Sequence, residues 1–81
     1  MLIIDAGHGG EDVGATTAEG VPESGINLAI AQKLEALSGL CGVECVMTRE
    51  SQEIAYPESA STTAQRKQAD QKARIELINA Q

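Results

Sequence analysis

Short apolar segments alternate with longer segments in which apolar residues recur at helical spacing. Residues 2–5 (LIID) are a short apolar run followed by glycines, as in a buried parallel strand, and every second residue of 43–48 (VECVMT) is apolar, as in a second strand. Residues 24–38 and 62–80 have the three- and four-residue spacing of helices. The order strand, loop, helix, strand, loop, helix predicts a right-handed βαβ unit followed by one further helix.

Both predicted helices have recognisable ends. Ser24 is a plausible N-cap of the first helix and Gly39 its predicted stop. Thr62 and Gln65 have the spacing of a capping box at the start of the second. The predicted apolar stripe of the first helix consists of Ile26, Ile30, Leu34 and Leu37, and that of the second consists of Ala69, Ala73, Leu77 and Ala80.

The predicted sheet is incomplete for an α/β domain. Two parallel strands are few, because parallel sheets are usually covered by helices on both faces. The 81 residues include one aromatic residue, Tyr56, so the core depends on aliphatic side chains and many alanines. We therefore expect an α/β fold with an incomplete parallel sheet, the front part of a larger domain, and low stability for the isolated chain.

Composition excludes some classes of partner. Twelve acidic and six basic residues give a formal charge of −6, and the basic residues of 66–74 (RKQADQKAR) are too sparse to follow a phosphate backbone, so we expect no nucleic-acid partner. No apolar run has the length of a membrane span, and any export signal lies outside this chain. Cys41 and Cys45 are not spaced like a metal or redox motif, and Cys45 fits a small buried residue of the second strand.

The glycine-rich segment after the first strand does not fit a nucleotide site. Ala15 stands where a phosphate-binding loop has its lysine, and Glu11 and Asp12 would repel phosphate. The dinucleotide pattern fails as well, because Gly7 and Gly9 are followed by Asp12 at the third glycine position.

The single histidine, His8, has two interpretations. It could be an incidental polar residue of a glycine turn. It also lies three residues after Asp5, beyond the carboxyl end of a strand, where α/β sheets bind ligands. Glu23, just before the first helix, could join it as a metal ligand, although a carboxylate there also suits the helix dipole. The chain has no second histidine to complete a His/Glu/His zinc site, so spacing alone leaves both interpretations open.

Three segments carry a resemblance to a known family: LIIDAGHGGEDVGA, PESGINLAIAQKLEAL and VECVMTRE. In order and spacing they resemble the N-terminal half of the zinc-dependent N-acetylmuramoyl-L-alanine amidases of the amidase-3 type, which are bacterial cell-wall hydrolases. The later RKQADQKARIELINA is similar to the family's arginine-containing helix and favours the sporulation and germination branch. The resemblance implies that His8 and Glu23 are zinc ligands, with Glu23 preceding the Asn27–Leu28 helix start. Ala6 replaces the usual proline of the turn.

The resemblance also implies what this chain lacks. The family's second zinc histidine, in an S-I-H-x-N context, and its catalytic glutamate have no counterpart here. We therefore expect residues 1–81 to be a partial catalytic domain that supplies no catalytic residue and is inactive alone. The implied cofactor is Zn²⁺ and the implied substrate is peptidoglycan, cut between N-acetylmuramic acid and L-alanine at the cell wall, extracellular or periplasmic. The alternative is a small non-catalytic α/β interaction module; the oligomeric state stays undetermined.

Three further residues near the turn have less specific interpretations. Asp5 could orient His8 or cap the turn. Glu11 fits a solvated surface residue. Arg49, in the family's Thr-Arg pair at the end of the second strand, could pair with Asp5 or Glu50, and a surface ion pair would contribute little.

Overall fold

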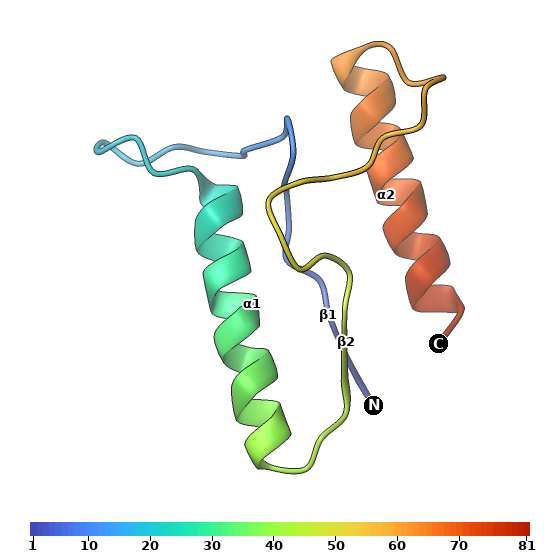
Figure 1. Cartoon of the computed structure of the whole chain (residues 1–81). Coiled ribbons are helices and arrows are strands. Elements are labelled where there is room, and N and C mark those ends of the chain that lie inside the picture. The colour runs from blue at the N-terminus through green and yellow to red at the C-terminus, as the bar shows by residue number, and fades with distance from the viewer.

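A computed structural model describes residues 1–81. The elements are β1 (Leu2–Ile4), α1 (Glu23–Leu40), β2 (Cys45–Met47) and α2 (Thr63–Asn79), so the predicted order and the α/β class are confirmed (Figure 1). Both strands are shorter than predicted. Neither helix is long and apolar enough to cross a membrane.

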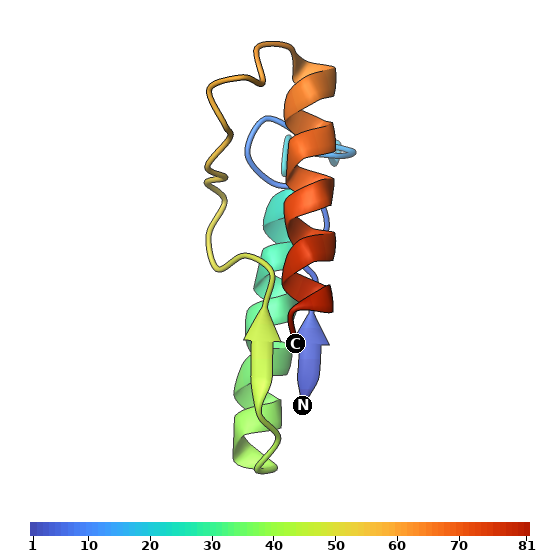
Figure 2. The same cartoon turned by 90° about the vertical axis from the view of Figure 1, so that its right-hand side faces the viewer.

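The two strands form a two-stranded parallel sheet with α1 as the connection between them. Leu2 pairs with Cys45 and Ile4 with Met47, and Figure 2 shows both strands pointing the same way. Their carboxyl ends therefore lie at the same edge of the sheet. The long loop that carries His8 leaves from this edge.

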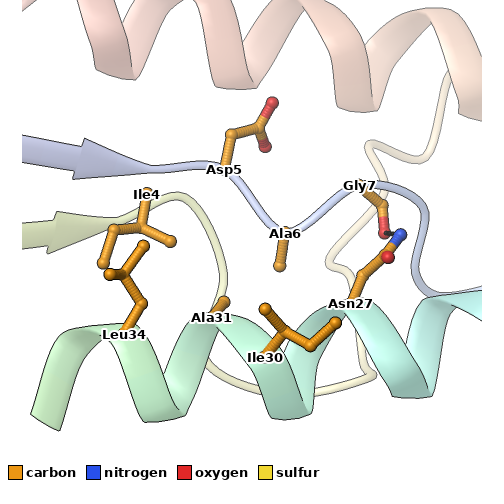
Figure 3. A pocket seen from close by; sticks show the side chains of 8 residues that line it. All are labelled: Ile4, Asp5, Ala6, Gly7, Asn27, Ile30, Ala31 and Leu34. Atoms are coloured by element: carbon orange, nitrogen blue, oxygen red, sulfur yellow. Dashed lines mark hydrogen bonds between the residues drawn. The ribbon is translucent and has the colours of Figure 1, made fainter. Parts of the chain in front are cut away.

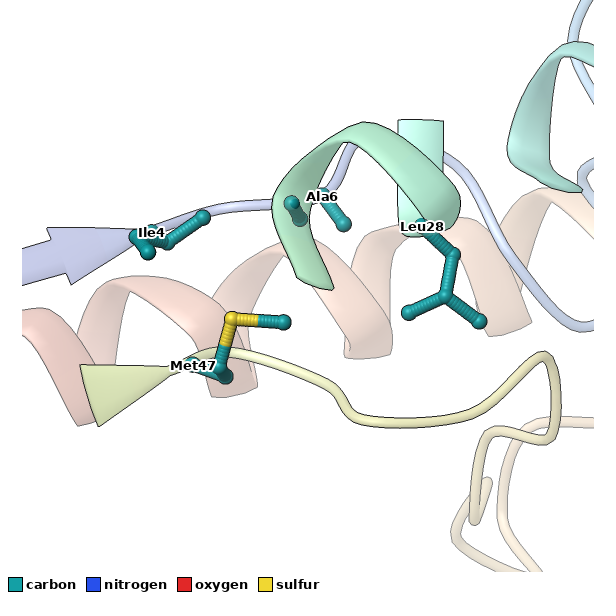
Figure 4. Packing of buried hydrophobic residues seen from close by; sticks show 5 residues of the cluster. Ile4, Ala6, Leu28 and Met47 are labelled. Atoms are coloured by element: carbon teal, nitrogen blue, oxygen red, sulfur yellow. The ribbon is translucent and has the colours of Figure 1, made fainter. Parts of the chain in front are cut away.

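The core is small and lies between α1 and the sheet. Its five buried residues are Ile4, Ala6, Leu28, Ala31 and Met47, with Cys45 packed against them (Figure 4). Two of the five are alanines, which bury little apolar area, as expected from the composition. Cys45 is partly buried, in line with its predicted role as a small strand residue.

The buried face of α1 is not the predicted stripe. Ile30 and Leu37 are each 60 % exposed, whereas Ser24, Leu28 and Ala31 are buried. Small residues on this face let the helix approach the strands closely, which explains why the bulkier stripe is turned aside. Ile30 and Leu34 instead border an open groove of about 380 Å³ beside β1 (Figure 3).

The ends of α1 also differ from the prediction. Its N-cap is Pro22, which makes no side-chain cap, and Ser24 lies buried within the first turn. Gly39 remains helical; the helix ends at Leu40 with Cys41 as its C-cap, and Gly42 follows with φ +75°. A left-handed conformation is what favours glycine just beyond a helix end.

The N-terminus of α2 is as predicted, but its packing is not. The Thr62 hydroxyl accepts from Gln65 N at 3.1 Å, and Gln65 Oε1 accepts from Thr62 N at 3.2 Å, so the capping box is confirmed. None of the residues of α2 is buried, including the predicted alanine and leucine stripe. Arginines, described below, attach this helix to the loop at the carboxyl edge of the sheet.

Candidate metal centre

A tight turn directly after β1 presents the imidazole. His8 has φ +63°, an uncommon conformation for a residue with a side chain. Gly9 and Asp12 close the turn, because Gly9 N donates to Asp12 O at 2.7 Å and Asp12 N to Gly9 O at 2.9 Å. Gly10, at φ +53°, lies so close to Tyr56 that a Cβ there would be 2.3 Å from its hydroxyl oxygen. The glycines thus allow the reversal that turns His8 back toward α1.

The start of α1 lies beside this turn because the loop pairs with it. Glu23 N donates to Ala15 O at 2.7 Å, and Ser24 N donates to Val13 O at 3.0 Å. As a result, His8 Nε2 lies 3.0 Å from Glu23 Oε2. Ala15 N also donates to that carboxylate oxygen at 3.1 Å and fixes its position.

Gly14 leaves room for these two side chains. A Cβ on Gly14 would lie 2.2 Å from Glu23 Oε2 and 2.9 Å from His8 Nε2, and its φ of +68° also favours glycine. The space between imidazole and carboxylate therefore depends on the absence of a side chain at this position.

Asp12 forms a hydrogen bond with the other ring nitrogen of His8, Nδ1. Its Oδ2 lies 2.9 Å from His8 Nδ1, and its Oδ1 accepts from Gly14 N at 3.3 Å. The hydrogen bond from His8 is the main cause that lowers the pKa of Asp12, with Lys67 also contributing. An ionised Asp12 accepts the proton of Nδ1, which leaves the Nε2 lone pair toward Glu23 in the neutral ring.

The short distance between His8 Nε2 and Glu23 Oε2 fits a proton or a cation shared by the two side chains. In the neutral ring, Nε2 and the carboxylate oxygen are both acceptors, and at 3.0 Å they need a shared proton or a cation. A zinc ion bonded tetrahedrally to one nitrogen and one oxygen would separate them by about 3.3 Å, close to the observed spacing. The two donors therefore fit a metal ion, although no group of three or more His, Cys, Asp or Glu side chains converges to hold one.

Arg49 forms no ion pair with Asp5 or Glu50, the pairing that the sequence suggested, and it does not lie at the surface. The residue is only 8 % exposed, and its guanidinium donates to the carbonyls of Ala6 at 2.9 Å, Gly7 at 3.0 Å and Ser24 at 2.9 Å. Burial lowers the pKa of Arg49, and the neighbouring Arg74 lowers it further. Nearly all of its partners are backbone carbonyls, which no pattern of side chains in the sequence reveals.

A second arginine, Arg74 of α2, contacts the same turn. It pairs with Asp5 at 2.8 Å and with Asp70 at 3.0 Å, and it donates to the carbonyls of Ala6 and His8. Burial opposes its charged form, but the hydrogen bonds to Asp70 and Asp5 outweigh burial and raise the pKa of Arg74. Asp5 also accepts from Thr48 Oγ1 at 2.7 Å, so it binds these partners and does not orient His8.

The chain matches a known protein family. The model of the N-acetylmuramoyl-L-alanine amidase family (Amidase_3) matches residues 2–77. The chain belongs to this family. The resemblance found in the sequence motifs is therefore confirmed, and the matched range includes both the His8 turn and the start of α1.

Individual amidases support the assignment. The chain is 33 % identical to the germination-specific N-acetylmuramoyl-L-alanine amidase of Bacillus subtilis over 98 % of its own length and 33 % of that enzyme. It is 56 % identical to a putative amidase of Buchnera aphidicola over 44 % of the chain and 15 % of that protein. The chain thus spans a third or less of the curated relatives it matches.

Two solved amidase structures share the fold. The CwlD amidase of Clostridioides difficile, in complex with the GerS lipoprotein, superposes with a TM-score of 0.87 at 40 % identity, over 95 % of this chain and 40 % of that one. The amidase AmiC2 of Nostoc punctiforme has a TM-score of 0.62 at 33 % identity, over 72 % and 32 %. The short sheet and its two helices therefore correspond to part of the amidase fold.

In this amidase-family chain, the structure brings together the two residues predicted as ligands, His8 and Glu23. It adds Asp12, which sequence reasoning missed as a partner of His8 although it lies four residues away in the same loop. Glu11 is exposed, as predicted, and pairs with Arg66. Asn27 donates to Gly7 O at 3.1 Å, a contact visible in Figure 3 that ties α1 to the turn.

Proposed function

We propose that this chain is part of the catalytic domain of a peptidoglycan amidase and that His8 and Glu23 hold a zinc ion. The observation that carries the proposal is the 3.0 Å approach of His8 Nε2 to Glu23 Oε2 at the carboxyl edge of the sheet. The reaction is hydrolysis of the amide bond between N-acetylmuramic acid and L-alanine. It takes place at the cell wall, extracellular or periplasmic, and the relatives favour a role in germination.

The residues of this chain prepare the site in three ways. Asp12 accepts the Nδ1 proton and so directs Nε2 of His8 into the site. Ala15 N holds the Glu23 carboxylate, and Gly14 leaves the space between the two ligands free. Zinc, when bound, supplies a Lewis acid that polarises water and the scissile carbonyl.

A catalytic site of this kind needs at least one further ligand and a general base. Residues 1–81 bring two donors together and no third one. We therefore propose that residues 1–81 are a partial catalytic domain and that this polypeptide by itself hydrolyses no cell wall. Release of L-alanine-terminated peptides from peptidoglycan by the purified chain would contradict this part of the proposal.

A second candidate function is binding of a partner protein without catalysis. It is supported by the CwlD neighbour, whose structure contains a lipoprotein partner, and by the apolar residues left exposed along α1. This function predicts no dependence on His8, so the same experiment separates the two candidates.

Equilibrium dialysis against Zn²⁺ tests the metal proposal. We expect the wild-type chain to bind one ion, and His8→Ala and Glu23→Ala to weaken binding by at least about tenfold, since each removes one of two donors. Glu44→Ala is the matched control, because Glu44 is an exposed carboxylate before β2, at the opposite end of the strand. Equal Zn²⁺ uptake by the wild type and both ligand variants would refute the site.

A further inference from the structure

One buried guanidinium connects both segments that carry the proposed ligands. Nη2 of Arg49 donates to Gly7 O at 3.0 Å and to Ser24 O at 2.9 Å. Gly7 immediately precedes His8, and Ser24 immediately follows Glu23. A single nitrogen atom thus joins the carbonyl of the residue before His8 to the carbonyl of the residue after Glu23. We propose that Arg49 is a positioning residue that sets the separation of His8 and Glu23, an inference that deepens the proposed zinc site and rests on it.

The remaining donors of Arg49 hold this nitrogen in place. Nε donates to Ala6 O at 2.9 Å, and Nη1 donates to Ser51 O at 2.9 Å and Gln52 Oε1 at 3.3 Å. All five N–H groups of the guanidinium therefore have acceptors. Each of the three guanidinium nitrogens is held by at least one acceptor. A shift of the segment carrying His8 or of the segment carrying Glu23 would therefore break other hydrogen bonds of Arg49.

The turn is built to admit the guanidinium at close range. A Cβ on Gly9 would lie 2.9 Å from Nε of Arg49, so the side chain lies directly against the turn that presents His8. No carboxylate forms an ion pair with Arg49, and backbone carbonyls supply nearly all of its acceptors. The guanidinium therefore serves to orient peptide groups. Arginine suits this role better than lysine, because its donors are held in a rigid planar fork.

Arg74 does not duplicate this link. It shares the Ala6 carbonyl with Arg49 and also reaches the carbonyl of His8, but it makes no contact with the start of α1. Of the two arginines, only Arg49 bonds to the residue after Glu23; Asn27 also ties α1 to the turn, through Gly7 O, but it does not bond to Ser24.

Arg49→Lys tests the proposal, because lysine keeps the charge but offers three donors from one point instead of a fork. Met47→Ala is the control: it removes a buried side chain from the core two residues away, and Met47 accepts none of the Arg49 hydrogen bonds. Zn²⁺ affinity is measured at a temperature where far-UV circular dichroism shows both variants folded. We expect Arg49→Lys to weaken Zn²⁺ binding by about tenfold or more, the usual effect of losing a residue that orients a ligand. We expect Met47→Ala to bind like the wild type.

A measurement without metal separates failure of this inference from failure of the zinc proposal. His8 is the only histidine, so its ring protons are assigned unambiguously, and its Cδ2 lies next to Gly14. We expect nuclear Overhauser effects between the His8 ring and Gly14 Hα in the wild type and Met47→Ala, and their loss in folded Arg49→Lys. If the wild type binds no Zn²⁺ but shows this pattern, the zinc proposal fails and the positioning role stands.

Two results would overturn the inference. One is an unchanged His8–Gly14 contact together with unchanged Zn²⁺ affinity in Arg49→Lys. The other concerns folding. If Arg49→Lys is unfolded even at low temperature in sulfate, Arg49→Gln is measured in its place. Unfolding of both variants would show that Arg49 supports the whole fold with no specific role at the site.

Discussion

Replacing Asp12 by alanine should release the imidazole of His8 from its present orientation. The carboxylate accepts from Nδ1 at 2.9 Å, and no other side chain contacts that nitrogen. Without this acceptor, the neutral ring is free to carry its proton on Nε2, the tautomer that intrinsically predominates in an unconstrained histidine. Nε2 would then donate to Glu23 instead of offering a lone pair to a metal ion.

The size of the effect follows from the hydrogen bond and its exposure. A hydrogen bond to an ionised group contributes about 1.5–3 kcal/mol when it is well buried. The side chains of His8 and Asp12 are 31 % and 28 % exposed, so solvent screening places this bond at the lower end. A loss of ~1.4 kcal/mol corresponds to about tenfold weaker Zn²⁺ binding.

Two assays check this prediction. Long-range ¹H–¹⁵N correlation spectra of the single histidine, recorded without metal in alkaline solution, report which ring nitrogen carries the proton. A Zn²⁺ titration then gives the affinity. Asp12→Asn keeps an acceptor oxygen and should have an intermediate effect. Glu11→Ala removes the adjacent carboxylate, which pairs with Arg66 and not with His8, and serves as the control. An unchanged tautomer in Asp12→Ala would refute the reasoning.

Three further predictions concern the turn and α2. Gly14→Ala should weaken Zn²⁺ binding by at least about tenfold, because its Cβ would meet Glu23 Oε2 at 2.2 Å and its φ is +68°; wild-type affinity would argue against a site between His8 and Glu23. Thr62→Ala should lower the free energy of unfolding by about 1 kcal/mol in urea titrations and leave Zn²⁺ binding unchanged, since it removes only the cap of α2. The folded-state pKa of Asp12 is lowered from 3.8, so its contribution to stability is complete above about pH 4 and is lost as the pH falls through the folded-state value. Acid titrations of Asp12→Asn should lack that loss, and an identical acid profile would contradict the assignment.

The attachment of α2 to the loop is mainly electrostatic. Arg66 pairs with Glu11, Arg74 with Asp5, and Lys67 lies 3.8 Å from Asp12, all from one helix that has no buried residue. Three basic side chains of this acidic chain thus face carboxylates of the loop that follows β1. This arrangement explains why an apolar stripe was a poor guide to the packing of α2: its charged face makes the contacts.

Local features of this protein follow from the sequence alone. The order of the four elements and the capping box of α2 depend on residues within a few positions of one another, so short-range patterns are sufficient. His8 and Glu23 could also be named in advance as candidate ligands, because the glycine turn and the Glu-x-x-x-Asn helix start resemble motifs of the amidase family.

The tertiary structure decided the rest. Helical spacing cannot select the buried face of α1, because the choice depends on how closely the strands approach, and small residues such as Ser24 and Ala31 allowed the closest approach. The hydrogen-bond partner of His8 is Asp12 and not Asp5, because the positive φ of His8 reverses the direction of its imidazole ring. Arg49 is buried because four carbonyls from three separate segments converge on it. Those acceptors are backbone atoms, present at every residue, and only the folded chain determines which of them meet.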